Sequence, residues 1–176
     1  MSKRAPRLPI SSKQRIGRIF SFLAGVGTAD PVSICARLAL LGIIGRDFIL
    51  YDRWLAVDAS VALLAGIVES SRHNPYSTES PETNLSDVLS RAGVCRTIYE
   101  LVGIDICVDG SPVDKLVEIT NKIRLGDIVL NEPIVVLLGK AVLVSVMHIV
   151  MRSPWLRGAF TLFKGEQEGV ESDFGI

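Results

Sequence analysis

One long apolar segment near the C-terminal end constrains this chain more than any other feature. Residues 133–151 contain a single formally charged side chain, Lys140, and one histidine, His148. As a helix, the segment would rise roughly 28 Å at about 1.5 Å per residue, close to the hydrocarbon thickness of about 30 Å in a bilayer. The segment therefore predicts either a transmembrane helix or a helix buried in the middle of a bundle, and both remain open.

Lys140 does not decide between these two alternatives. A lysine at depth costs roughly 2.5–3.5 kcal/mol on insertion scales, whereas each Leu, Ile or Val returns about 0.3–0.6 kcal/mol. The segment holds enough of them to outweigh one lysine, which lies near the N-terminal end and could snorkel to the interface. In the buried alternative, both Lys140 and His148 need polar partners.

Residue pairs that start helices divide the rest of the chain. Asp30-Pro31, Ser111-Pro112 and Ser153-Pro154 each place a capping side chain before a proline at the first helical position. Apolar residues then recur at helical spacing. The expected helices are 11–24, a helical region 31–70 with a possible turn at 51–54, 85–106 with Asn84 as cap, 112–123, 133–151 and a short one after Pro154.

This pattern predicts an all-α protein of five to seven helices, a membrane-associated helical bundle with one possible transmembrane helix, residues 133–151. Residues 71–84 are polar and rich in turn formers, so we expect an exposed connection. The predicted organisation is a basic amphipathic N-terminal segment (1–29), a single helical domain (30–164) and an acidic disordered tail (165–176).

Charge is unevenly distributed although the formal net charge is +0. Because the protein has no net charge, it has no overall electrostatic attraction to nucleic acid, and no nucleic-acid partner is expected. The head, residues 1–29, has six basic side chains and no acid, which is typical of a mitochondrial transit peptide. Its predicted helix, 11–24, could lie in a lipid interface or dock on the rest of the protein.

No catalytic, cofactor-binding or metal-binding residues are predicted. The sequence has no phosphate-binding glycine loop, no HExxH or GxSxG motif and no CxxC pair. The three cysteines, Cys35, Cys95 and Cys107, lie in apolar runs, so we expect buried reduced thiols rather than a disulfide or zinc site. His148 is expected to be a hydrogen-bonded core or interface residue.

Nine residues are predicted to contact the membrane or a partner. Basic and aromatic side chains of the head, the dense polar group 46–54 and the tryptophan between arginines after residue 151 fit interfacial positions. An internal salt bridge within 46–54 is the structural alternative. The nine are Arg15, Arg18, Phe20, Arg46, Asp47, Trp54, Lys140, Trp155 and Arg157.

Residues 16–61 resemble the peroxin-11 family of peroxisome-proliferating membrane proteins. The likeness consists of a basic amphipathic helix, Asp30-Pro31, Arg46-Asp47-Phe48-Ile49-Leu50, Asp52 and Trp54-Leu55. The resemblance implies membrane remodelling by an inserted amphipathic helix, self-association and a location in the peroxisomal membrane.

The expected function is that of a non-catalytic accessory subunit of a membrane-embedded assembly in the mitochondrial inner membrane, with other subunits and lipid as partners and no cofactor. A peroxin-11-like remodelling protein is one alternative. The other is a soluble helical ligand-binding bundle, which predicts an internal pocket lined by Arg46, Asp47 and His148.

Overall fold

The computed structural model describes residues 31–45, 47–73 and 80–152, and this part of the chain folds into helices without strands. The predicted all-α class is thereby confirmed for the described residues. The head, with its expected helix 11–24, and everything after residue 152 lie outside them. The helices are α2 (Pro31–Ile44), α3 (Leu50–Arg72), α4 (Leu85–Arg91), α5 (Val94–Val102), α6 (Pro112–Leu125) and α7 (Glu132–Arg152).

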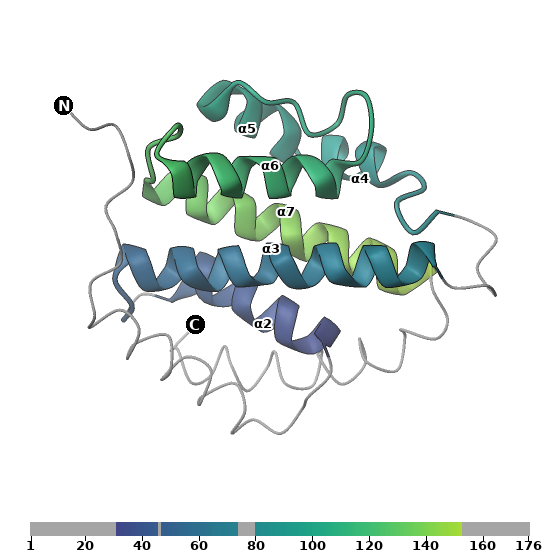
Figure 1. Ribbon diagram of the computed structural model, residues 1–176, viewed down its shortest axis with the longest axis horizontal. Coiled ribbons are helices and arrows are strands. Elements are labelled where there is room, and N and C mark those ends of the chain that lie inside the picture. Colours follow the sequence, from purple (N-terminus) through teal and green to yellow (C-terminus); the bar gives the residue numbers. More distant parts are fainter. Residues whose placement is uncertain (1–30, 46, 74–79, 153–176) are drawn as a thin grey trace.

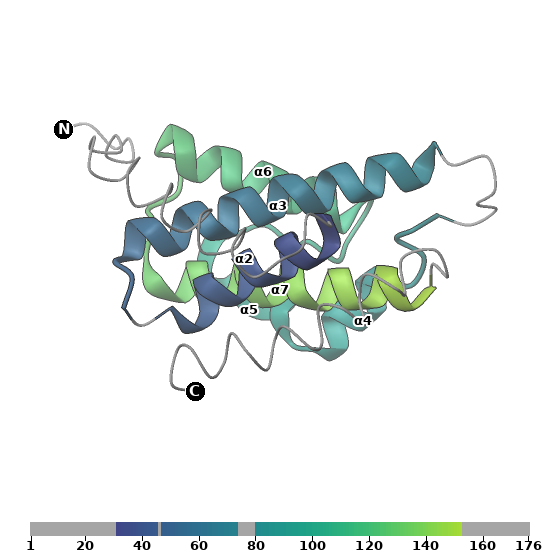
Figure 2. The ribbon, with the colours of Figure 1, turned by 90° about the horizontal axis from the view of Figure 1, so that it is seen from below.

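The two long helices, α3 and α7, run in the same direction, and α2 packs against both (Figures 1 and 2). Arg53 Nη1 lies 3.2 Å from Glu132 Oε1, which joins the first turn of α3 to that of α7. Helix α6 runs the other way along α3, because Arg124 near its end reaches Asp58 in the first half of α3 at 2.7 Å. The short helices α4 and α5 cover α7.

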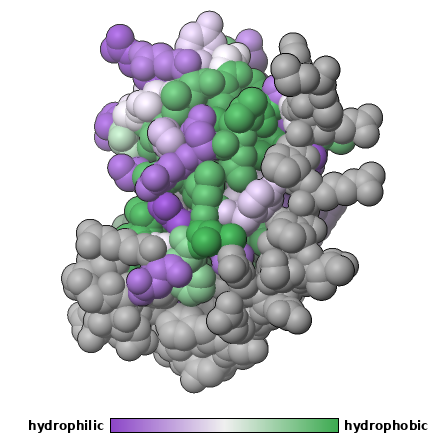
Figure 3. All heavy atoms as spheres, turned by 90° about the vertical axis from the view of Figure 1, so that its left-hand side faces the viewer, coloured by the Kyte–Doolittle hydropathy of each residue, from purple (hydrophilic) through white to green (hydrophobic). Residues whose placement is uncertain are grey.

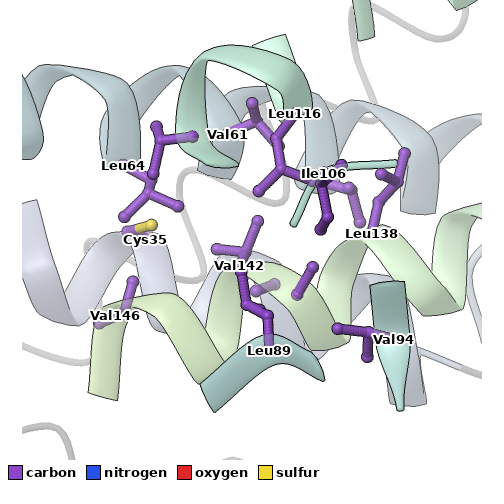
Figure 4. Packing of buried hydrophobic residues seen from close by; sticks show 14 of the residues in the cluster. Cys35, Val61, Leu64, Leu89, Val94, Ile106, Leu116, Leu138, Val142 and Val146 are labelled. Carbon is purple, nitrogen blue, oxygen red and sulfur yellow. The ribbon is translucent and has the colours of Figure 1, made fainter. Parts of the chain in front are cut away.

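A large apolar core lies between these helices (Figure 4), and a smaller second cluster consists of Leu38, Leu41 and Ala56 of α2 and α3. Cys35 of α2 faces Leu64 of α3, and Val142 and Val146 of α7 fill the space beside them. Fully burying a side chain of this size contributes roughly 1.5–3 kcal/mol. The apolar run 133–151 therefore supplies the middle of a bundle, as one of its two interpretations predicted.

The predicted helix start at Ser111-Pro112 is confirmed. Helix α6 begins at Pro112, and the Oγ of Ser111 accepts a hydrogen bond from the Asp114 backbone N–H at 3.1 Å. At the start of α7, Asn131 Oδ1 accepts from the Ile134 N–H at 3.0 Å. Both side chains satisfy backbone donors that a helix leaves unpaired.

The turn within residues 31–70 lies earlier than predicted. Gly45 N–H donates to Leu41 O at 2.9 Å and Phe48 N–H to Gly45 O at 3.1 Å, so α2 ends there and α3 begins at Leu50. Residues 51–54 are therefore the first turn of α3 and not a turn between helices. Trp54 consequently faces the core and is only 4% exposed.

The third predicted helix, 85–106, is broken in two. Gly93 has φ +80° between α4 and α5, and Gly103 has φ +76° at the end of α5. Such a left-handed conformation suits glycine, because it lacks a Cβ, and it ends helices. Asn84 occupies the cap position but has a left-handed backbone and makes no side-chain capping bond.

Two of the three cysteines are paired, which corrects the expectation of reduced thiols. Cys95 of α5 and Cys107 in the following loop form a disulfide with their Cα atoms 6.0 Å apart, a normal separation for such a bond. The chain reversal after Gly103 brings them together. Cys35 is free and buried, its Sγ donates to Ser60 O at 3.1 Å, and burial raises the pKa of its thiol.

Helices α3 and α7 are each long and apolar enough to cross a membrane, which points weakly to membrane association. Half of the apolar window of α3 and 56% of that of α7 are buried inside the bundle. Since the two helices run the same way, a bilayer crossed by both would also have to be crossed by residues 73–131. The helix of that segment running in the opposite sense, α6, has 14 residues, among them two acidic and three basic ones. This arrangement therefore accommodates at most one of them as a span.

Candidate functional site

Several charged side chains of the described bundle tie helices together at their ends. Arg53, in the first turn of α3, donates from Nε to Gly42 O at 3.0 Å and from Nη2 to Ile43 O at 3.4 Å. A cation at the last carbonyls of α2 is favourable because these oxygens carry the negative end of the helix dipole. With its third contact, to Glu132, Arg53 links α2, α3 and α7 at one end of the bundle.

A second cluster links helices at the opposite end. The Glu82 side chain is only 8% exposed and accepts from Arg72 Nη2 at 2.5 Å, from the Ser111 hydroxyl and from the Val113 N–H at 3.3 Å. It thus joins the end of α3 to the start of α6, whose unpaired N–H groups favour a carboxylate. Pro81 is buried as well, so the predicted exposed loop 71–84 holds at least two buried side chains.

His148 belongs to this second end. Its Nε2 lies 2.7 Å from Thr83 O, so the last turns of α7 are fixed to the segment before α4. Asp47 is exposed in the turn between α2 and α3, near the start of α3. Because Asp47 and His148 occupy opposite ends of the bundle, the pocket predicted between them does not form. His148 is the hydrogen-bonded packing residue that the sequence favoured.

The predicted contact residues fall into three groups. Trp54 is buried in the core, so the expectation that its ring contacts a membrane or partner is wrong for this fold. Asp47 and Lys140 are exposed and remain available for contacts. The other six lie outside the described residues: Arg15, Arg18, Phe20, Arg46, Trp155 and Arg157.

Sequence reasoning missed an exposed apolar surface at the end where α3 and α7 begin. We call it the apolar end, and it consists of Ile49, Leu101, Leu125 and Val129, which are 48%, 43%, 64% and 75% exposed. Figure 3 looks onto this end and shows apolar surface there, with hydrophilic side chains among it. The signal was present in the run Ile128-Val129-Leu130, three apolar residues in a row in a loop between two helices.

A shallow apolar depression between α5 and α7 adjoins the apolar end. It is lined by Ile98, Leu101, Val102, Ile134, Leu137 and Leu138. Two arginines of the described part of the chain that lie near this end are already paired, Arg53 with Glu132 and Arg124 with Asp58. The surface therefore offers apolar contact rather than a cationic site for a phosphate headgroup.

A second apolar surface runs along the outside of α7. We call it the α7 stripe, and it consists of Pro133, Val136, Lys140, Leu143, Val144, Met147 and Met151. Lys140 is exposed at its centre and forms no hydrogen bond or ion pair with the residues that the structure describes. Met147 and Met151 are 46% and 55% exposed.

Within the described residues, no group of three or more His, Cys, Asp or Glu side chains could hold a metal ion. What the geometry offers is surface for packing: the apolar end and the α7 stripe. No family model, curated protein or solved structure matches the chain. The resemblance of residues 16–61 to the peroxin-11 family therefore stays a prediction.

Proposed function

We propose that this chain is a non-catalytic accessory subunit of a membrane-embedded assembly, that its membrane is mitochondrial, and that it works through helix–helix and lipid contacts. The observation that carries the proposal is the apolar end. There, four large apolar side chains are 43% to 75% exposed, beside two helices of membrane-spanning length. Apolar side chains grouped at the junctions of several helices mark an interaction surface.

The size of the apolar end indicates how it is used. Each of its four side chains is already partly buried, with 43% to 75% still exposed, so covering them completely would contribute roughly 1–2 kcal/mol apiece. Association itself costs about 4–15 kcal/mol. The apolar end alone therefore supports only weak docking, and stable incorporation needs further contacts. This arithmetic favours a subunit held inside a larger particle over a protein that binds bare membrane by itself.

The test follows the full-length protein in cells. Membranes are fractionated by organelle, washed with alkaline carbonate and then solubilised in mild detergent for native electrophoresis. We expect the protein in the mitochondrial membrane pellet, released by detergent as part of a larger particle. Recovery as a small soluble species after the carbonate wash would contradict the proposal, and recovery in another organelle would contradict its mitochondrial part.

A matched pair of variants tests the surface itself. Val129→Glu places a charge on the apolar end, and Val108→Glu places the same charge in the loop before α6, where Val108 is 50% exposed. Both positions face solvent, so neither change should unfold the bundle. We expect Val129→Glu to reduce the fraction in the large particle at least threefold, and Val108→Glu to leave it unchanged. Equal behaviour of the two variants would count against the apolar end.

A further inference from the structure

The disulfide between Cys95 and Cys107 carries an inference about the compartment of the bundle and about a partner that the chain needs. Cys95 lies in the first turn of α5 and is only 5% exposed, whereas Cys107 is partly buried in the loop after α5. Cys35, the third cysteine of the sequence, is free and buried. The two sulfurs of the bond therefore differ in exposure, and a protein that oxidises them reaches Cys107 first.

The loop that contains Cys107 is part of the folded core. Ile106, the residue before Cys107, is fully buried, although residues 103–111 form neither helix nor strand. The Cys107 N–H donates to Asp105 Oδ1 at 2.9 Å, and Lys115 Nζ donates to Asp105 O at 3.1 Å. Because these contacts fix the loop, the disulfide fastens a segment that the bundle already covers, and its role is structural.

A structural disulfide restricts the compartment in which a protein folds. Disulfides form and persist in oxidising compartments and are rare where glutathione and thioredoxin keep thiols reduced. In a mitochondrion the space between the two membranes is the oxidising compartment, and the matrix is reducing. We propose that a thiol–disulfide oxidoreductase of the intermembrane space oxidises Cys95 and Cys107, and that the described bundle lies in that space. The choice of this space rests on the proposed mitochondrial function, whereas the need for an oxidising partner does not.

The oxidation takes two exchange steps. The Cys107 thiolate attacks one sulfur of the oxidoreductase disulfide, which forms a mixed disulfide and releases the second oxidoreductase sulfur as a thiolate. The Cys95 thiolate then attacks the Cys107 sulfur, which closes the disulfide of the chain and releases the other oxidoreductase sulfur. The two protons of the cysteine thiols end on the oxidoreductase. It leaves as a dithiol, reduced by the two electrons that the chain has lost.

The order of attack is tested on the purified full-length protein, reduced and freed of reductant, with glutathione disulfide as the probe. Cys95→Ser leaves Cys107 available, and Cys107→Ser leaves Cys95. We expect mass spectrometry to find glutathione on the first variant at least tenfold faster than on the second, because only an accessible thiol reacts. The parent chain, quenched early and mapped by peptide, should carry its first glutathione on Cys107, and this measurement needs no substitution. A first modification on Cys95 would overturn the order.

The oxidation itself is tested in cells. Free thiols are alkylated in intact cells before lysis, and the full-length protein is then isolated and its cysteine peptides are mapped by mass spectrometry. We expect the peptides of Cys95 and Cys107 to be joined and not alkylated. Alkylation of both cysteines in most molecules would show that the pair is reduced in the cell, and would overturn the proposal.

The side of the membrane has its own measurement. Glu118→Cys on α6 and Arg91→Cys on α4 each place a thiol at a position whose side chain is 52% and 72% exposed, respectively. We expect a membrane-impermeant maleimide to label these thiols in isolated mitochondria once the outer membrane is opened. Labelling of both positions only after the inner membrane is dissolved would place the bundle in the matrix and overturn the choice of compartment. The subunit proposal would survive that result, because carbonate extraction and native electrophoresis do not depend on the side of the membrane.

Discussion

Replacing Gly42 with alanine should destabilise the bundle, because α2 and α3 meet there without room for a side chain. A Cβ built on Gly42 would lie 2.1 Å from Val57 Cγ2, and the Arg53 carbonyl oxygen stands 3.5 Å away on the same side. Carbon atoms pack at about 3.5–4.0 Å, so the overlap exceeds 1 Å. Val57 is fully buried, and a β-branched side chain in a helix has essentially one rotamer. The overlap is therefore relieved only if the helices move apart.

Overpacking of this kind costs about 1–3 kcal/mol. Alanine recovers up to about 1 kcal/mol of helix propensity over glycine, so we expect a net loss of about 1–2 kcal/mol for Gly42→Ala. Gly66 in α3 provides the matched control, because a Cβ there would meet nothing within 4 Å. Gly66→Ala should gain about 1 kcal/mol from propensity alone. The same substitution thus changes the free energy of unfolding in opposite directions at the two sites.

The assay is urea unfolding of the two purified variants and the parent chain, followed by circular dichroism. The free energy of unfolding falls by about 1–3 kcal/mol per molar urea. The urea midpoints of the two variants should therefore differ by roughly 1 M or more. The reasoning is refuted if Gly42→Ala proves as stable as Gly66→Ala. Helices α2 and α3 would then not pack at the distance that the structure shows.

Two further predictions concern the disulfide and the buried carboxylate. Replacing Cys95 and Cys107 together with serine should lower the free energy of unfolding by about 3 kcal/mol, the loop-closure value for this separation. Thiol titration of the folded parent chain without reductant should find no reactive cysteine, because Cys35 is buried and burial raises the pKa of its thiol. The denatured chain should show one reactive cysteine. Three reactive cysteines in the denatured chain would disprove the disulfide. Glu82→Gln should cost about 2 kcal/mol, because Arg72 and the start of α6 lose a charged acceptor. Glu118→Gln, an exposed change on α6, should stay within about 0.5 kcal/mol in the same urea titration.

The helix start at Ser111-Pro112 was predictable from sequence, because capping is a local interaction. Ser111-Pro112 and Asn131 carry their own hydrogen-bonding groups within three residues of the backbone donors they satisfy. Helix ends were less predictable. Gly45 and Gly93 both break helices, yet Gly66 lies within α3 without breaking it. A glycine therefore does not by itself mark the end of a helix.

Long-range features escaped sequence reasoning for a related reason. Cys95 and Cys107 are brought together by the reversal after Gly103, and Glu82 meets Ser111 across 29 residues. Neither pairing has a local signature. The apolar end, in contrast, had one: three consecutive apolar residues in the loop 126–131. Apolar side chains in a loop between two capped helices are a signal that a sequence reading can use.

Lys140 shows how the fold changes the meaning of a sequence feature. From sequence, a lone lysine in an apolar run raises the question of whether its charge enters the bilayer or the protein core. In the bundle its charge does not enter the protein core, because α7 packs against α2, α3, α4 and α5 and directs Lys140 outward. Helices α3 and α7 each bury one face in the bundle, and this burial accounts for many of their apolar residues without a membrane. Their composition alone is therefore weak evidence that either helix spans a bilayer. The argument for membrane association therefore rests on what remains exposed, and the sharpest discriminator is a charge placed at Val129: if the apolar end is ordinary surface, that charge will change nothing.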